Sequence, residues 1–246
     1  MRVVCIIPAR YNSTRLSGKP LLKIKGKPLV QWVFENAQRI SSVENIWIAT
    51  DDERVIECVE GFSGNGILTS PMHSSGTERV KEASETLGLE DGDIVINLQV
   101  DEPVIDVKSV EKLIEEFSRN PSLLMGTLAF QSKNLEEFHN PNVVKVVVNR
   151  EGFALYFSRS PIPCPRDTEE INFLKHLGVY IFRYSFLRKW DSLSPSFLEE
   201  VEKLEQLRVL ENGYPIKVLL SSQVSIGVDT EEDLRFMEEN IEKFWK

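Results

Sequence analysis

Three cations fall within ten residues of one another just after the first apolar run of the chain. They are Arg10, Arg15 and Lys19, and the hydrogen-bonding residues Asn12, Ser13 and Thr14 lie among them. Guanidinium and ammonium groups make charge-assisted hydrogen bonds to phosphate oxygens, so this composition suits a polyphosphate ligand. The alternative is a solvated surface loop. Because a loop that leaves a buried strand of an open α/β sheet lies where ligands bind, its position favours phosphate binding.

Carboxylates at two other positions could hold a divalent cation. Asp101 and Glu102 follow an apolar run at 94–98, and Mg²⁺ is usually bound by one or two carboxylates together with phosphate oxygens. We predict a metal ligand at Asp101, whereas Glu102 is expected to cap the helix that starts near residue 107. Asp229 precedes Thr230 and Asp233, which form a capping box. Locally, Asp229 therefore fits the start of a helix better than a second metal ligand.

Other common catalytic patterns are missing from the sequence. Histidine occurs at 73, 139 and 176 and cysteine at 5, 58 and 164, without the spacing of a zinc site or a C-x-x-C pair. Pro follows Lys19 and Lys27 where a P-loop needs Ser or Thr, and no G-x-S-x-G elbow is present. Arg159 lies in a proline-rich stretch with His176 behind it. These two could hold an acidic substrate, although an arginine in such a loop is more often a surface residue.

Composition limits the partners and the cellular location. The 246 residues include 29 Lys+Arg and 38 Asp+Glu, which gives a net charge of −9. A nucleic-acid-binding protein would normally carry a basic face, so we expect no nucleic-acid partner. The apolar start is too short for a signal-peptide core or a membrane span, and the unpaired cysteines suit a reducing compartment. We expect a cytoplasmic protein with no membrane partner.

The elements that must position these side chains alternate between strand and helix. Apolar, β-branched runs predict buried parallel strands at 3–8, 45–50 and 93–98, and helical patterns separate them at 28–39, 53–62 and 77–87. A further helix and strand are predicted at 107–117 and 123–130. Such alternation is typical of βαβ units. The glycine-containing segment 61–66 is predicted to be a turn.

The pattern changes after this strand. Two runs at 143–148 and 153–158, joined by turn residues, predict a β-hairpin, and a third strand is expected at 178–182. The chain then returns to a helix at 197–210, a strand at 216–220 and a helix from 230. We therefore expect one domain over 1–246, with its main core in 1–137 and 183–246 and a β-rich insertion at 138–182.

Seven short motifs, taken in chain order, resemble the 3-deoxy-D-manno-octulosonate cytidylyltransferase (CMP-Kdo synthetase) family. They are Ile7-Pro8-Ala9-Arg10-x-x-Ser13-Thr14-Arg15-Leu16-x-Gly18-Lys19-Pro20, Ser75-Gly76-Thr77-Glu78-Arg79, Gln99-x-Asp101-Glu102-Pro103, Phe157-Ser158-Arg159-Ser160-Pro161-Ile162-Pro163, Lys175-His176-Leu177-Gly178, Leu204-Glu205-Gln206-Leu207-Arg208 and Gly227-Val228-Asp229-Thr230. Any one could arise by chance, but seven in register along nearly the whole chain are highly specific.

The resemblance implies a Rossmann-like, GT-A-like nucleotidyltransferase whose mixed, mainly parallel sheet is flanked by helices. It implies transfer of CMP from CTP to the anomeric hydroxyl of Kdo, an acidic eight-carbon sugar, with release of pyrophosphate, for lipopolysaccharide biosynthesis. It also implies Mg²⁺ as cofactor and a homodimer, with the insertion at 138–182 contributing to sugar binding and dimerisation.

The resemblance also assigns residues. The nucleotide-binding set it implies is Pro8, Ala9, Arg10, Asn12, Ser13, Thr14, Arg15, Lys19, Ser75, Gly76 and Arg79. The sugar-binding set is Arg10, Gln99, Arg159, His176, Glu205 and Gln206, with Arg159 opposite the carboxylate. Asp101 and Asp229 become the metal ligands, against the local preference for Asp229 as part of a cap, and both join Arg15 and Lys19 as catalytic residues.

Val100 departs from the family pattern, which commonly has Gly between the Gln and the Asp. If that position needs a positive φ, a β-branched residue there is costly. Two alternatives stay open at this point. One is a related enzyme acting on another acid sugar, such as sialate or an amino-substituted Kdo, and the other is a nucleotide-binding regulatory protein that has lost turnover.

Overall fold

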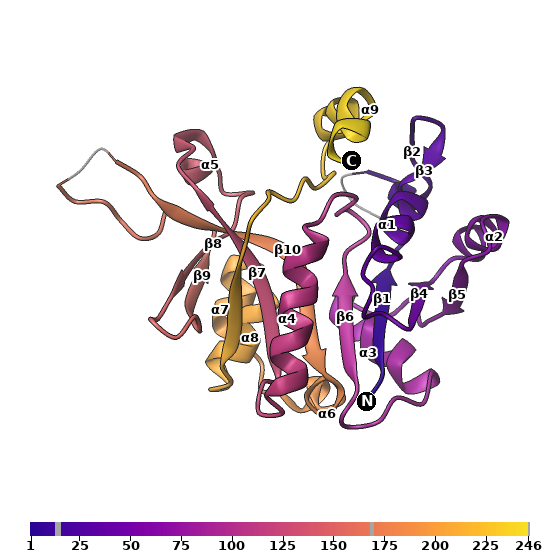
Figure 1. Ribbon diagram of the computed structural model, residues 1–246, viewed down its shortest axis with the longest axis horizontal. Coiled ribbons are helices and arrows are strands. Elements are labelled where there is room, and N and C mark those ends of the chain that lie inside the picture. Colours follow the sequence, from indigo (N-terminus) through magenta and orange to yellow (C-terminus); the bar gives the residue numbers. More distant parts are fainter. Residues whose placement is uncertain (13–15, 168–169, 246) are drawn as a thin grey trace.

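The computed structural model describes residues 1–12, 16–167 and 170–245 of the chain. Within them one nine-stranded sheet runs through the molecule in the order β11-β7-β10-β6-β1-β4-β5, with β8 and β9 paired beyond this path (Figure 1). The bounds of the strands are β1 Val3–Pro8, β4 Asn45–Thr50, β5 Asn65–Leu68, β6 Ile94–Leu98, β7 Met125–Ser132, β8 Lys145–Val148, β9 Ala154–Ser158, β10 Phe173–Arg183 and β11 Ile216–Ser221.

The N-terminal part is the parallel α/β unit that the sequence predicts. β1 pairs in parallel with β4 and β6, and β4 with β5, so that their carboxyl ends share one edge of the sheet. Helices α1 (Leu29–Ala37), α2 (Glu53–Gly61) and α4 (Val107–Arg119) pack on one face, and α3 (Gly76–Thr86) packs on the other. Alternate residues of β1 serve the two cores, because successive side chains of a strand point to opposite faces.

β10 lies at the centre of the sheet. It runs antiparallel between β6 and β7, starts five residues earlier than the predicted strand, and also pairs with β8 at its N-terminal end. The boundary expected at residue 182 therefore falls inside the main sheet, because β10 belongs to the core and only the segment before it projects. The predicted hairpin is confirmed, since β8 and β9 form an antiparallel pair.

Three smaller differences concern local signals. The predicted helix at 197–210 is two helices, α7 (Phe197–Glu202) and α8 (Gln206–Glu211), because Lys203 adopts the left-handed conformation with φ 54°. The predicted turn at 61–66 leads directly into β5. A two-stranded sheet of β2 (Lys23–Ile24) and β3 (Lys27–Pro28) follows the 3-10 helix η1 (Lys19–Leu21).

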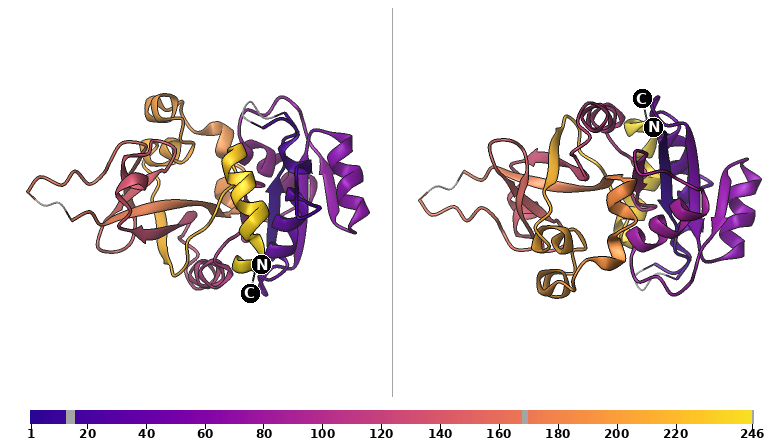
Figure 2. Two further views of the ribbon diagram at one scale, coloured as in Figure 1. Left: turned by 90° about the horizontal axis from the view of Figure 1, so that it is seen from above. Right: turned by 90° about the horizontal axis from the view of Figure 1, so that it is seen from below.

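The last helix packs against residues near the start of the chain. α9 (Glu231–Phe244) starts with the predicted capping box, in which Thr230 is the N-cap. Met237 and Ile241 pack with Ile24 and Leu29 in a separate apolar cluster. Two further short helices are α5 (Leu135–His139) and α6 (Tyr184–Leu187). Figure 2 shows α9, in yellow, beside the N-terminal strands. This packing places residues 225–229 at the same sheet edge as η1.

Candidate functional site: two joined cavities at the sheet edge

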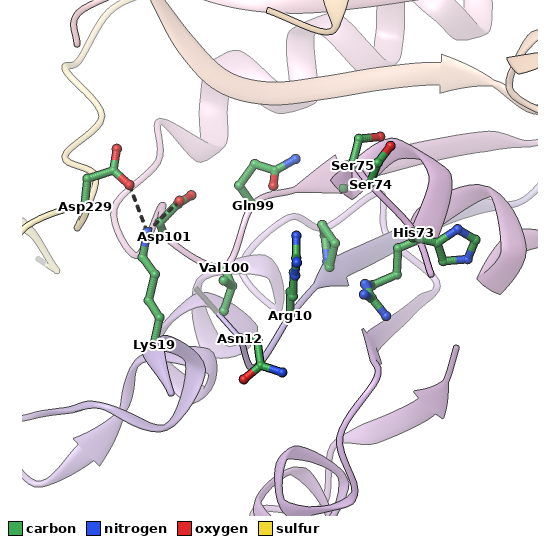
Figure 3. Close-up of a pocket in the computed structure, with 13 residues that line it drawn as sticks. Arg10, Asn12, Lys19, His73, Ser74, Ser75, Gln99, Val100, Asp101 and Asp229 are labelled. Atoms are coloured by element: carbon green, nitrogen blue, oxygen red, sulfur yellow. Dashed lines mark hydrogen bonds and ion pairs between the residues drawn. The ribbon is translucent and has the colours of Figure 1, made fainter. Parts of the chain in front are cut away.

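One ammonium group and two carboxylates meet where β1 and β6 end (Figure 3). The Nζ atom of Lys19 lies 2.8 Å from Oδ2 of Asp101 and 3.0 Å from Oδ1 of Asp229. The Lys19 residue is 7% exposed. Burial opposes its charge, but Asp101 and then Asp229 outweigh it and raise the pKa of Lys19 above its usual value. The three predicted residues therefore form one ion-paired cluster.

Backbone pairing holds the two carboxylates together. The Val228 N–H donates to the Asp101 carbonyl at 2.8 Å, and Ile226 forms an antiparallel bridge with Val104. Residues 225–229 thus run beside the loop that carries Asp101. Asp229 is not the helix cap, since Thr230 has that role, and its carboxylate is directed at Lys19. This arrangement supports a joint role for Asp101 and Asp229.

The cap prediction for Glu102 is wrong. Asp106 is the N-cap of α4, and its side chain accepts from the Ser109 N–H. Glu102 instead accepts a short hydrogen bond from the Ser225 hydroxyl and lies against Gly178, where a Cβ would come within 2.7 Å of Oε1. Burial, and then the charge of Asp101, raise the pKa of Glu102 to about 7. Glu102 therefore connects its own loop to the segments around Gly178 and Ser225, next to Asp101.

A cavity of about 260 Å³ opens beside this cluster. The residues expected to bind nucleotide that line it are Pro8, Arg10, Asn12, Lys19, Ser75, Gly76 and Arg79. Ala9 does not line it, because it is fully buried and its N–H bonds to Ala49 of β4 at 2.8 Å. Ser13, Thr14 and Arg15 lie outside the described residues. Figure 3 shows Arg10 and Asn12 on the side of the cavity opposite Gln99.

Arg79 lines this cavity and also makes hydrogen bonds within the protein. It is 2% exposed, and its guanidinium donates to Thr69 Oγ1 at 2.6 Å and to Asp51 at 3.3 Å. Burial lowers the pKa of Arg79, which Asp51 partly opposes. Arg79 thus ties α3 to the segment that follows β5. Its effect on a nucleotide would come through the shape of that segment.

His73 lines the same cavity, although the spacing of the histidines in the sequence predicts no site there. Its ring Nε2 makes a short contact with the Glu82 carboxylate, and Glu78 accepts from the Ser74 N–H at 2.7 Å. Two acidic residues of α3 therefore hold the loop 70–75 against the cavity. No local motif marks His73, because its partner comes from the next helix.

A second, larger cavity of about 1160 Å³ adjoins the first. Gln99, Arg159, His176, Glu205 and Gln206 line it, and Ser75, Gly76, Gln99 and Asp229 line both cavities. These residues come from the end of β6, the end of β9, the middle of β10 and the start of α8. The structure therefore brings together five of the six residues expected to bind the sugar, whereas Arg10 lies in the first cavity.

Arg159 supplies positive charge to the second cavity. Its guanidinium donates to backbone carbonyls of Glu202 at 2.7 Å and of Pro141 at 2.9 Å. Lys145, which is fully buried, donates to the Arg159 carbonyl at 2.6 Å. The guanidinium is thereby fixed in place by carbonyl dipoles, and its charge stays available to an anion.

Uncharged hydrogen-bonding groups of β10 and α8 also line this cavity. Burial lowers the pKa of His176 to about 3, so its imidazole is uncharged near neutral pH, and its Nε2 lies 2.9 Å from Thr127 Oγ1. The Tyr180 hydroxyl donates to Gln206 Oε1 at 3.0 Å. The buried Gln206 Nε2 has no hydrogen-bond partner among the described residues. A buried amide N–H without a partner is costly, so this atom is a natural donor to a ligand.

Two kinds of feature are absent from the part of the chain that the structure describes. None of its helices has the length and apolar character that crossing a membrane requires. No group of three or more His, Cys, Asp or Glu side chains there could hold a metal ion by itself. Asp101 and Asp229 are a pair, so further ligands would have to come from substrate or water.

A sheet edge with cations, a carboxylate pair and two adjoining cavities is typical of the class of nucleotidyltransferases. The particular family follows from the sequence comparison. The chain belongs to the cytidylyltransferase family, whose model matches residues 4–224.

Individual relatives are similar over almost their whole length. The chain is 49% identical over 236 residues to a 3-deoxy-manno-octulosonate cytidylyltransferase of Syntrophobacter fumaroxidans, covering 95% of this chain and 94% of the relative. It is 48% identical over 242 residues to an 8-amino-3,8-dideoxy-manno-octulosonate cytidylyltransferase of Shewanella baltica, covering 98% and 99%. A solved CMP:2-keto-3-deoxy-manno-octonic acid synthetase complexed with CTP matches with a TM-score of 0.92 and 42% identity over 99% of both chains.

Proposed function

We propose that this protein transfers CMP from CTP to the anomeric hydroxyl of 3-deoxy-D-manno-octulosonate, giving CMP-Kdo and pyrophosphate. The observation that carries the proposal is the junction of the two cavities. A phosphate-binding region with Lys19 opens at Gln99 into a second cavity whose cation, Arg159, is suited to a carboxylate. The product would activate Kdo for lipopolysaccharide biosynthesis.

In this reaction the sugar oxygen forms a bond to the α-phosphorus while the bond between the α-phosphorus and the pyrophosphate oxygen breaks. The hydroxyl proton passes from the sugar oxygen to water, and the pyrophosphate oxygen keeps the electron pair of the broken bond. Lys19 and Arg10 would bind phosphate oxygens, and their positive charge would stabilise the negative charge that grows on the leaving group. Positioning of the two substrates on either side of Gln99 would supply much of the remaining rate enhancement.

Mg²⁺ fits the donor set of the cluster. Two carboxylates, Asp101 and Asp229, converge on one point within reach of the phosphate region, which is the usual protein contribution to a Mg²⁺–nucleotide site. We propose that these two side chains hold the ion. When bound, Mg²⁺ would neutralise phosphate charge and orient the triphosphate. Lys19 would then release one or both carboxylates to the ion and turn toward the phosphates.

The second cavity contains side chains that suit an acidic sugar. Arg159 would pair with the carboxylate of Kdo, and the free Gln206 N–H with a sugar oxygen. Neutral His176 would offer a hydrogen bond to a hydroxyl without attracting a second anion. Glu205 would accept a hydrogen bond from a hydroxyl on the same wall.

Pyrophosphate release tests this function directly. The purified protein is incubated with each of CTP, UTP, ATP and GTP, with Mg²⁺, with Kdo, with sialate and without sugar. Release confined to CTP with Kdo, and abolished by EDTA, is the expected result. Failure of every pairing would contradict the proposal and would favour a binding protein without turnover.

A second candidate substrate is 8-amino-3,8-dideoxy-manno-octulosonate. The relative of Shewanella baltica named for it is as similar to this chain as the relative named for Kdo. The same assay with both sugars compares kcat/KM. A value for the amino sugar more than about tenfold above that for Kdo would keep the chemistry and change the acceptor.

The resemblance also suggests a cytoplasmic homodimer. Large apolar side chains of the part around the second cavity, Leu155, Phe197 and Val201, are more than 60% exposed, which is compatible with a subunit contact. Light scattering of the purified protein would give a mass of two chains if this proposal is correct. A single-chain mass at micromolar concentration would contradict it.

A further inference from the structure

A line of buried polar side chains connects the two cavities behind the site. The Gln99 amide nitrogen donates to Asn97 Oδ1 at 2.9 Å, and the Asn97 amide nitrogen donates to Thr77 Oγ1 at 3.2 Å. The Thr77 hydroxyl donates to Glu205 Oε1 at 2.6 Å. Asn97 and Thr77 are fully buried, so water does not share in these bonds. The line therefore runs from the junction at Gln99 to the wall of the second cavity at Glu205.

These hydrogen bonds run in one direction along the line. The Thr77 hydroxyl directs its single proton to Glu205 Oε1, a carboxylate whose pKa burial raises above its usual value. Thr77 can then only accept from Asn97, which must turn its amide nitrogen toward Thr77 and its oxygen toward Gln99. Gln99 must in turn direct its amide nitrogen to Asn97. Its Oε1 is thereby left for the cavity.

Two further observations show that this arrangement is built into the fold. The Ser75 hydroxyl and the Thr77 backbone N–H also face the Glu205 carboxylate, which lies at the N-terminal end of α3. Burial raises the pKa of Glu205, and these donors at a helix N-terminus partly oppose that rise because they stabilise a negative charge. At the other end, Gly76 leaves room for the Gln99 amide, since a Cβ there would lie 3.1 Å from both of its terminal atoms.

We propose that Thr77 and Asn97 are positioning residues for the transfer reaction, because their hydrogen bonds fix the Gln99 amide with Oε1 presented to a hydroxyl of the incoming acceptor. Neither side chain touches a substrate in this scheme. This inference rests on the proposed function, because it concerns how the same site receives its acceptor.

The decisive variant is Thr77→Val, which keeps the shape of the side chain and removes the hydroxyl. Thr77→Ser retains the hydroxyl and serves as the rescue. Ser84→Ala is the matched control, because Ser84 is also a buried hydroxyl of α3 but donates to the Val80 carbonyl at 2.7 Å, away from both cavities. Each variant is compared with the wild type in KM for Kdo, KM for CTP and the Kd of Kdo and of CTP by calorimetry.

We expect Thr77→Val to raise KM and Kd for Kdo about tenfold, the effect of losing one oriented hydrogen bond, while Kd for CTP stays within about twofold. Thr77→Ser should return the values for Kdo to within about threefold of the wild type, and Ser84→Ala should change none of them. Equal losses for Kdo and CTP would assign Thr77 a purely structural role and overturn the proposal.

The outcomes separate this inference from the function on which it rests. A wild-type protein that binds Kdo without releasing pyrophosphate would contradict the function, and the Kd comparison would still decide the role of Thr77. A wild type that releases pyrophosphate, beside a Thr77→Val variant with unchanged affinity for Kdo, would overturn the inference alone. If Thr77→Val does not fold, Asn97→Ala interrupts the same line and carries the same expectation.

Discussion

The two cavities share Gln99, but different interactions hold the side chains that line each of them in place. The first is built from charges, with Lys19 ion-paired to Asp101 and Asp229. In the second, buried hydrogen-bonding groups, among them a His176 that burial keeps uncharged, lie beside charged side chains that include Arg159. Charged groups can exchange partners when a polyphosphate enters, whereas a buried neutral network has one satisfied arrangement. Under the proposed function, the first cavity would support the chemistry and the second would select the acceptor.

The connections of the sheet explain this difference. Around the first cavity the strands are parallel, and loops at their carboxyl ends bring charged residues to a solvent-accessible edge. Around the second cavity, β10 is antiparallel and crosses the middle of the sheet, so His176 and Tyr180 project from a strand that is packed on both sides. Side chains at such positions must be neutral or fully hydrogen-bonded.

Asp101→Ala should give the largest effect, because it removes charge from the first cavity. We expect kcat to fall by about 10³-fold or more, with the fold retained. Steady-state assay and thermal unfolding measure the two properties. Asp91→Ala, at an exposed carboxylate paired with Arg188, is the control and should leave both near wild type. Near-normal turnover in excess Mg²⁺ would remove Asp101 from the chemistry.

Arg159→Ala should act on the acceptor and spare the nucleotide. Loss of a charge-assisted, bidentate contact is expected to raise KM for Kdo by about 10–100-fold, while KM for CTP changes by less than about threefold. Arg159→Lys should recover little, since an ammonium lacks the planar fork. Arg188→Ala, at an exposed arginine, is the control. Equal increases in both KM values would place Arg159 outside the acceptor cavity.

His176 gives a prediction on stability. Its pKa is about 3 in the folded protein, below the ordinary value of 6.5, so below about 6.5 the unfolded chain binds a proton that the folded chain does not. The free energy of unfolding should therefore fall as pH decreases from about 6.5 toward about 3, by at most about 1.4 kcal/mol per pH unit from this group. His176→Gln should reduce that slope in urea unfolding series.

The control for the pH series is His139→Gln, at an exposed histidine of α5. It should leave the acid slope as it is in the wild type. If His176→Gln also leaves the slope unchanged, the imidazole is protonated in the folded protein, and the neutral description of the second cavity is wrong.

Val100→Gly should have the smallest effect on turnover. Val100 does not adopt a positive φ, is 8% exposed and belongs to the main apolar core, so the family's usual glycine is not needed here. We expect about 2 kcal/mol lower stability from lost burial and added chain freedom, with kcat within about twofold. Val100→Ala separates the two causes. A large gain in kcat for Val100→Gly would show that Val100 strains the Asp101 loop.

Local sequence predicted elements well where a single segment contains the signal. The parallel strands, the hairpin of β8 and β9 and the capping box of α9 were all predicted from neighbouring residues. The break at Lys203 was missed because its conformation depends on how α7 and α8 pack. The start of β10 was missed because polar residues interrupt its apolar pattern, and its pairing with three other strands stabilises it.

The residues of the candidate site also divide into those that local sequence predicted and those that it missed. The place of Arg10, Asn12 and Lys19 beside the first cavity could be predicted from the residues of their own loop. The roles of Glu102, His73 and Thr77 could not be inferred, because the role of a buried polar residue depends on its hydrogen-bond partners elsewhere in the chain. Glu102 meets Ser225, which lies 123 residues later, and Thr77 meets Glu205 across 128 residues.

By itself the sequence determined the α/β class, the capping box of α9 and the concentration of cations after β1, since these follow from periodicity, capping and composition within short segments. Only the tertiary structure decided that Lys19 meets Asp101 and Asp229, which are 82 and 210 residues away, and that β10 carries the second cavity into the core. Contacts between distant segments depend on the packing of α9 and on sheet order. These are properties of the whole fold, and no local preference encodes them.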